Sequence, residues 1–120
     1  MDLVLEVRTG RDRVTMGCHG KLIGGKEADA FRRSAVLLIG GFDKITIDLA
    51  GIRMVDCGGL GSLAGVLSLA RDKGTVVKII HASPLIVEEL RLTRLDEFLE
   101  KTESMRPQLV VNDSSREAVA

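Results

Sequence analysis

The sequence predicts an α/β domain built on a mixed sheet of four to five strands. Two runs of alternating apolar and polar residues open the chain, and segments with helical and strand periodicity then alternate. Short turns favour antiparallel pairing, whereas parallel strands need helical crossovers. The 120 residues suffice for one hydrophobic core but not for two. We therefore expect a single domain over residues 1–120, with its core at about residues 2–99.

The opening hairpin is predicted from residues 3–18. Gly10-Arg11-Asp12 separates two runs in which every second residue is apolar. These apolar residues are Leu3, Leu5 and Val7, then Val14, Met16 and Cys18. The two strands should pair antiparallel and bury one face.

The next two elements are a helix and a strand. Apolar residues recur at three- and four-residue steps from Lys26 to Ile39, and Gly40-Gly41 is expected to end this helix. From Lys44 to Leu49 the alternation returns to period 2, which predicts a strand. The chain then passes through Ala50, Gly51 and Ile52 to a turn at Asp56.

A second helix is predicted from Gly59 to Lys73, with Gly74 as its stop. A strand follows from Thr75 to His81. Ser83-Pro84 then has the residues preferred at a helix N-cap and first turn, and opens a short helix to about Leu92.

Residues 100–120 are weakly patterned. Leu109-Val110-Val111 is a candidate for a short extended piece, and Ser114-Ser115-Arg116-Glu117 has the spacing of a capping box. We expect this end to be frayed or ordered only by docking.

Composition excludes several classes of function. Lys plus Arg and Asp plus Glu are both 17, and aromatic residues make up only 2% with no Trp or Tyr, which argues against nucleic-acid binding. No apolar run has the roughly 18–20 residues of a membrane span, and the N-terminus lacks a signal-peptide pattern. Cys18 and Cys57 form no CxxC motif. We expect a cytoplasmic protein without a metal, a disulfide or a cofactor.

The glycine-rich segments match no nucleotide-binding motif. Gly24-Gly25-Lys26 lacks the spacing and the hydroxyl residue of a Walker loop, and Gly58-Gly59-Leu60-Gly61 is not GxGxxG.

The titratable residues also form no recognisable catalytic group. His19 and His81 lie near strand ends without a nearby nucleophile, and we expect backbone groups to satisfy them. Asp48 and Asp56 are better interpreted as turn or cap residues than as an acid–base pair. We therefore expect no enzyme activity.

The turn Asp56-Cys57-Gly58-Gly59-Leu60 is the candidate functional site. Free N–H groups at a helix start stabilise a phosphate or a thiolate, so a residue at Cys57 is well placed for a switch. The alternative is that Asp56 only caps the helix and the glycines only permit the turn. Small residues follow along one helical face, where a partner backbone can approach or a neighbouring helix can pack: Gly58, Gly61, Ser62, Gly65 and Ser68.

The segment from Ile47 to Gly61, IDLAGIRMVDCGGLG, resembles the STAS signature, in which a strand ending in D-L-S leads through a hydrophobic stretch to D-S-S-G-L-G. A second segment resembles the family's S-P-x-V-x-x-L-x-x-T-G-L motif. It consists of Ala82-Ser83-Pro84 with Leu90, Leu92, Thr93 and Leu95. The resemblance runs from the opening hairpin to about Leu99. It implies an anti-sigma factor antagonist, a small domain that binds an anti-sigma factor kinase and is released when a serine is phosphorylated.

The switch serine of the family is absent from this chain. The signature Asp falls on Asp56, the phosphorylated serine on Cys57, the second serine on Gly58 and the signature glycine on Gly59. Ser62, the nearest hydroxyl, lies about one turn into the helix. The acidic residue of the family's G-x-L-D loop is also missing, since Ile23 follows Gly20-Lys21-Leu22.

Three hypotheses follow. The first is a non-phosphorylated module that docks a kinase-like anti-sigma factor or a related signalling protein through residues 56–65. These docking residues are Asp56, Cys57, Gly58, Gly59, Gly61, Ser62 and Gly65. The second keeps a switch as a redox-sensitive thiol at Cys57. The third is a scaffold or regulatory subunit of a transporter ATPase or a stress-sensing complex.

Overall fold

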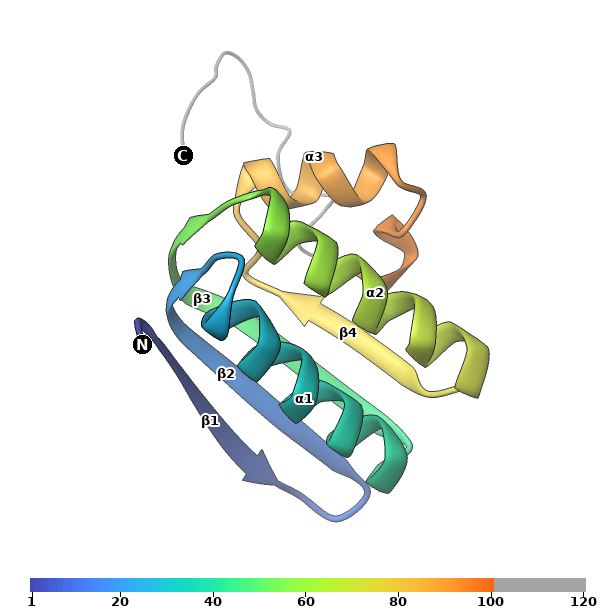
Figure 1. Ribbon diagram of the computed structural model, residues 1–120. Helices are drawn as coiled ribbons and strands as arrows, with labels where there is room; N and C mark the ends of the chain where they lie inside the picture. The colour runs from blue at the N-terminus through green and yellow to red at the C-terminus, as the bar shows by residue number, and fades with distance from the viewer. Residues whose placement is uncertain (101–120) are drawn as a thin grey trace.

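A mixed four-stranded sheet forms one layer of the molecule in the computed structural model, which describes residues 1–100 (Figure 1). The strands lie in chain order: β1 (Leu3–Thr9), β2 (Arg13–Leu22), β3 (Lys44–Val55) and β4 (Val76–Ile80). β1 pairs antiparallel with β2, and the other two pairs are parallel. The predicted mixed sheet with an opening hairpin is confirmed, with four strands among the residues described.

The helices α1 (Lys26–Gly41) and α2 (Cys57–Lys73) cover one face of this sheet. Each joins two parallel strands, and both crossovers step in the same direction along the sheet. Because such crossovers are almost always right-handed, they place both helices on the same side. A third helix, α3 (Pro84–Leu92), and a 3-10 turn, η1 (Asp96–Phe98), follow β4 and pack beside α2 (Figure 1). The opposite face of the sheet carries no helix from the described part of the chain.

The core lies between the sheet and the helices and is almost entirely aliphatic. Alternate residues of β2, β3 and β4 enter it, and β1 adds one: Val14, Met16 and Cys18 of β2, Ile45, Ile47 and Leu49 of β3, Val77 and Ile79 of β4, and Leu3 of β1. Phe31 of α1, with Leu63, Val66 and Leu67 of α2, packs against them from the helical side. The period-2 and period-3.6 patterns of the sequence therefore mark most of the buried faces. The edge strand β1 is the exception, because Leu5 is only partly buried and Val7 is exposed.

Two element ends differ from the sequence prediction. Gly40 and Gly41 lie inside the last turn of α1, and the chain leaves the helix at Phe42, which is extended and packs on the core. β3 continues six residues beyond Leu49, because β2 runs on beside it and pairs Lys21 with Met54 and Leu22 with Val55. Tertiary pairing thus overrides the weak local signal after Leu49.

The second half of the chain follows the prediction closely. α2 starts at Cys57, two residues before the expected start, and ends at Gly74, which is left-handed with φ 76°. β4 is slightly shorter than predicted. Ser83 caps α3 as expected, its hydroxyl oxygen accepting from the Ile86 N–H at 3.3 Å.

The η1 turn was not predicted. It buries Phe98, and Leu99 then forms a single parallel bridge with Ile79 of β4. The elements suggested near Leu109 and Ser114 lie outside the described residues. No helix in residues 1–100 is long and apolar enough to cross a membrane.

Candidate functional site

Asp56 joins two loops at the end of the sheet where the parallel strands finish. It follows β3 directly and takes an extended conformation as the N-cap of α2. Its Oδ1 accepts hydrogen bonds from the Gly59 N–H at 2.9 Å and from the Gly24 N–H at 3.0 Å. One carboxylate oxygen therefore caps α2 and holds the β2–α1 loop against its first turn.

The two glycines after Cys57 let α2 approach this loop closely. A Cβ on Gly58 would lie only 2.7 Å from the Cα of Gly24, and a Cβ on Gly59 would run into the carbonyl of Leu22. The same Leu22 oxygen accepts from the Asp56 N–H at 3.4 Å. Gly58 and Gly59 thus have a packing role inside the domain, whatever else this turn does.

Cys57 is one of the residues that line a shallow groove between α2 and α3. The groove has a volume of about 240 Å³. Its walls are Cys57, Leu60, Gly61 and Ala64 from α2, and Glu89, Leu90 and Thr93 from the region of α3. Sequence reasoning missed the α3 wall because nothing in the local pattern shows which face of α3 meets α2.

The remaining candidate residues, Gly61, Ser62 and Gly65, lie in the next turns of α2 and differ in their surroundings. Gly61 and Gly65 are exposed, and a Cβ at either position would meet no described atom within 4 Å. Ser62 is half-buried, and its hydroxyl donates to the Ala28 carbonyl of α1 at 3.0 Å. The small-residue face therefore divides into an open stripe and a residue that packs against the neighbouring helix.

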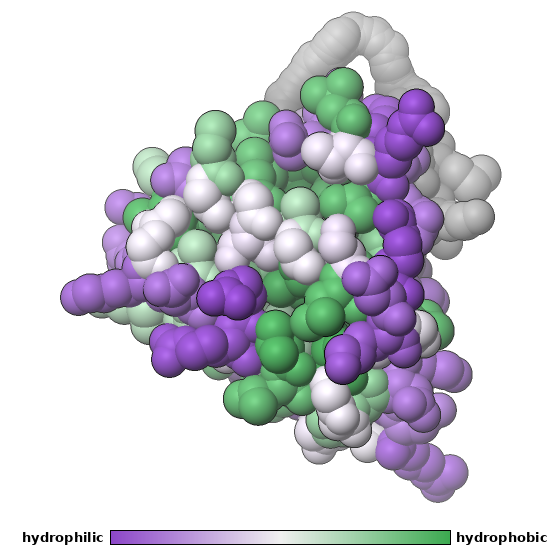
Figure 2. Space-filling model, turned by 45° about the vertical axis from the view of Figure 1, so that its right-hand side comes forward, coloured by the Kyte–Doolittle hydropathy of each residue, from purple (hydrophilic) through white to green (hydrophobic). Residues whose placement is uncertain are grey.

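Figure 2 shows part of this helical side as a surface. A band of apolar and weakly polar residues crosses the view between groups of hydrophilic side chains. Such a band, with charge kept to its borders, is the pattern found at many protein–protein interfaces.

The two cysteines lie in different environments. Cys57 is exposed, whereas Cys18 is fully buried in the core under the sheet. Burial, with a smaller contribution from the charge of Asp48, raises the pKa of the Cys18 thiol to about 12. Only Cys57 is accessible to a reagent in the folded protein.

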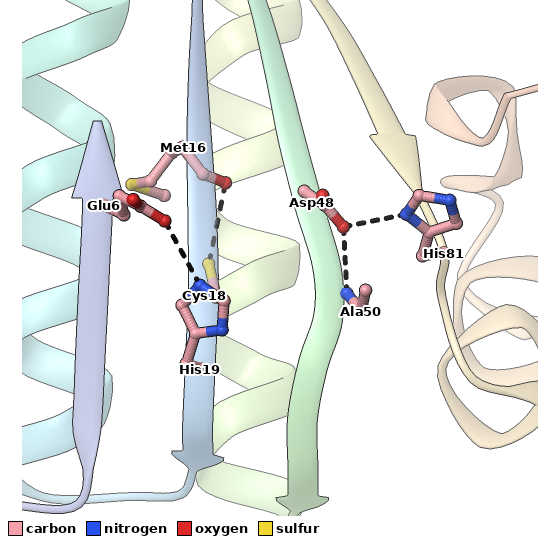
Figure 3. Close-up of polar contacts among 7 residues, drawn as sticks. All are labelled: Glu6, Met16, Cys18, His19, Asp48, Ala50 and His81. Atoms are coloured by element: carbon pink, nitrogen blue, oxygen red, sulfur yellow. Dashed lines mark hydrogen bonds and ion pairs between the residues drawn. The ribbon is translucent and has the colours of Figure 1, made fainter. Parts of the chain in front are cut away.

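The two histidines each pair with a carboxylate on the strands (Figure 3). His19 lies 3.5 Å from Glu6, and His81 Nδ1 lies 2.9 Å from Asp48 Oδ1. We expected backbone partners. The sequence does not reveal these pairs, because each joins two segments that only the folding of the sheet brings together. Partial burial raises the pKa of Asp48, but hydrogen bonds from His81 and the Ala50 N–H outweigh it and hold that pKa below its usual value.

Asp48 and Asp56 therefore have separate hydrogen-bond partners. Asp56 caps a helix as expected, whereas Asp48 lies inside β3 and not in a turn, because β3 extends to Val55. Within residues 1–100, no group of three or more His, Cys, Asp or Glu side chains is arranged to hold a metal ion.

Solved structures with a similar fold cover most of the chain. Phosphorylated SpoIIAA, described as a Bacillus cell fate determinant, matches with a TM-score of 0.68 at 15% identity, over 85% of this chain and 96% of that one. An anti-sigma factor antagonist from Mycobacterium paratuberculosis matches with a TM-score of 0.67 at 19% identity, over 85% and 88%. A putative anti-sigma factor antagonist from Thermotoga maritima gives 0.64 at 19%, over 84% and 91%.

At sequence identities of 15–19%, the similarity to these structures shows a shared fold and nothing more. No curated protein sequence matches the chain. The sequence does match the family described as "Mlab, STAS domain" over residues 22–105, which is more than half of its length. That span includes the Asp56 turn, α2 and α3, and the chain therefore belongs to the STAS domain family.

Proposed function

We propose that this domain is a protein-binding regulator of the anti-sigma factor antagonist type, which docks a kinase-like anti-sigma factor or a related signalling protein. The observation that carries the proposal is the open stripe of Gly61 and Gly65 beside the groove at Cys57. STAS domains are regulatory and generally not enzymes, and no catalytic step is assigned here.

The docking surface combines two kinds of contact. A partner backbone can approach α2 closely at Gly61 and Gly65, because no side chain stands in its way. The groove between α2 and α3 can take an apolar side chain against Leu60 and Ala64. Asp56, with Gly58 and Gly59, supports this surface by fixing the first turn of α2.

Docking is proposed to be independent of phosphorylation. Cys57 and Gly58 carry no hydroxyl, and the hydroxyl of Ser62 is already bonded to α1. Incubation with the cognate anti-sigma factor kinase and ATP should leave residues 56–62 unmodified in a mass spectrum of the peptide. Stoichiometric phosphate there would contradict this part of the proposal.

The docking surface is tested by filling it. Gly65→Phe places a large side chain in open space, so the fold should persist while partner capture from source-cell lysate falls at least about tenfold. Gly40→Phe is the matched control, because Gly40 is also helical, exposed and without neighbours at its Cβ position. Equal capture by both variants would show that the surface is wrongly placed.

A second candidate role is a regulatory subunit or scaffold in a larger assembly, such as a transporter ATPase. It is favoured by the similarity of this fold to small parts of longer chains, namely 20% of the chain described as Mglu and 16% of that of SLC26A9. The identity of the captured protein distinguishes the two roles: a sigma regulator supports the first, and a transporter ATPase supports the second.

The exposed position of Cys57 also favours a thiol switch as an alternative. In a labelling titration near neutral pH, Cys57 should react in the folded protein, whereas Cys18 should react only on unfolding because its pKa is raised to about 12. Oxidation of Cys57 should then weaken partner capture, and Cys57→Ser should remove that sensitivity. An unreactive Cys57 would exclude the switch.

A further inference from the structure

The sheet face that carries no helix is sorted by charge. Its outward side chains form rows across the strands, set by the strand register. The first row is Arg13, Lys44 and Val76, and the second is Arg8, Thr15, Thr46 and Lys78. The third row begins the acidic half, with Glu6 and Asp48. One half of the face thus presents four cations and no carboxylate from the strands.

The excess of positive charge belongs to this half of the sheet and not to the whole chain, which has 17 basic and 17 acidic residues. Arg13 and Lys44 even stand directly opposite each other on β2 and β3, an arrangement of like charges that weakens a sheet. Asp12, in the hairpin turn, lies 3.9 Å from Arg13 and 3.7 Å from Lys44. Asp12 therefore compensates one of these two positive charges, and a net positive charge remains on this half of the face. Arg8 and Lys78 form no salt bridge within 4 Å of a described carboxylate, although the charge of Arg8 helps to lower the pKa of Asp48 in the next row.

Three of the four cations also line a shallow hollow. It has a volume of about 240 Å³, and its walls are Arg13, Lys44, Ile45, Thr46, Val76 and Lys78. Val76 is half exposed and gives the hollow an apolar margin next to the cations. A ligand here meets dispersed positive charge, the side chain of Thr46 and aliphatic surface together.

We propose that this basic sheet face, defined by Arg8, Arg13, Lys44 and Lys78, binds an extended acidic segment of a partner protein. The cations are spread over four strands, roughly 14 Å at the usual strand spacing, rather than gathered around one point. The N–H groups of the central strands β2 and β3 bond within the sheet, and no helix begins at this end, so the backbone cradle of a phosphate site is missing. An extended peptide instead presents a carboxylate on one side at every second residue, about 7 Å apart.

This surface lies on the opposite side of the sheet from the Gly61–Gly65 stripe. It is therefore a second contact, which stands or falls independently of the docking site proposed above.

The test is an NMR titration of the isotopically labelled full chain with hexaglutamate as the probe. We expect amide shifts at the four cationic positions that fade as salt is added. Lys44→Glu combined with Lys78→Glu should weaken binding about tenfold or more. Both side chains point to solvent, so the fold should be retained, and an unchanged circular dichroism spectrum checks this.

The matched control reverses two charges on α1, Lys26→Glu with Arg32→Glu, and should leave the affinity unchanged. An equal loss in this control, or shifts spread over all basic residues, would overturn the proposal by showing unspecific attraction. It would also be overturned if tripolyphosphate or vesicles of anionic lipid shifted these residues and hexaglutamate did not, since the ligand would then be a phosphate group or a membrane surface. The Gly65→Phe variant should bind hexaglutamate as well as the natural chain does.

Discussion

Two pairs of glycines in α2 are alike in sequence and different in use. Gly58 and Gly59 lie in the first turn against the β2–α1 loop, where a Cβ would meet Gly24 or Leu22. Gly61 and Gly65 lie one and two turns later in open space. The first pair is required by the fold of the domain itself. The second pair weakens the helix without any packing reason in the described structure, which leaves it free for a partner.

The largest expected effect on stability comes from the packed pair, Gly58 and Gly59. Gly59→Ala forces a methyl group into the Leu22 carbonyl, which is backbone and cannot turn aside, so we expect a loss of about 3 kcal/mol in the free energy of unfolding. Urea unfolding of the full chain measures it. Gly61→Ala is the control and should not be destabilised. A mild effect at Gly59 would mean that α2 can move away from the loop and that the two pairs do not differ.

Asp56 links the packed pair to the loop and should rank next. Asp56→Ala removes the acceptor for both Gly59 and Gly24, and we expect a loss of about 2 kcal/mol in the free energy of unfolding. Asp56→Asn keeps an oxygen at the same place and should recover more than half of this loss. If Asn were as damaging as Ala, the negative charge rather than the hydrogen bonds would be the stabilising feature.

Arg94 shows the converse case, a non-glycine residue where glycine would fit the backbone. It stands at the glycine of the family's T-G-L segment and has a left-handed φ of 62°. Arg94→Gly should therefore raise the unfolding free energy by about 1 kcal/mol. Arg32→Gly, in the interior of α1, should lower it by a similar amount. Loss of stability in both variants would mean that the Arg94 side chain contributes more than the strain costs.

The smallest effect on stability is expected from the open pair, Gly61 and Gly65. Gly65→Ala should raise the unfolding free energy by about 0.5–1 kcal/mol, because alanine has the higher helix propensity and its methyl group meets no neighbour. A thermal melt with partner capture measured in parallel checks both consequences. Stabilisation without loss of capture would show that close approach at this position is not needed. Destabilisation would place Gly65 with the packed pair.

Much of the fold could be predicted from local patterns. The opening hairpin, the two crossover helices and the Ser83 cap follow from periodicity and capping residues, which are properties of short segments. The length of β3 could not be predicted, because its last six residues are held by β2 rather than by their own alternation. The end of α1 was also missed, since Phe42 rather than Gly40 stops the helix by packing on the core.

At the candidate site, the sequence by itself determined the turn at Asp56, the missing switch serine and the run of small residues on α2. The tertiary structure decided which of these residues are available to a partner: it packs Gly58 and Gly59 against the β2–α1 loop, bonds Ser62 to α1 and leaves Gly61 and Gly65 open. The tertiary structure also decided which carboxylates pair with the two histidines, and it aligned the basic residues in rows across the sheet. Contacts between strands and helices distant in the chain depend on register and helix placement, which no local pattern specifies.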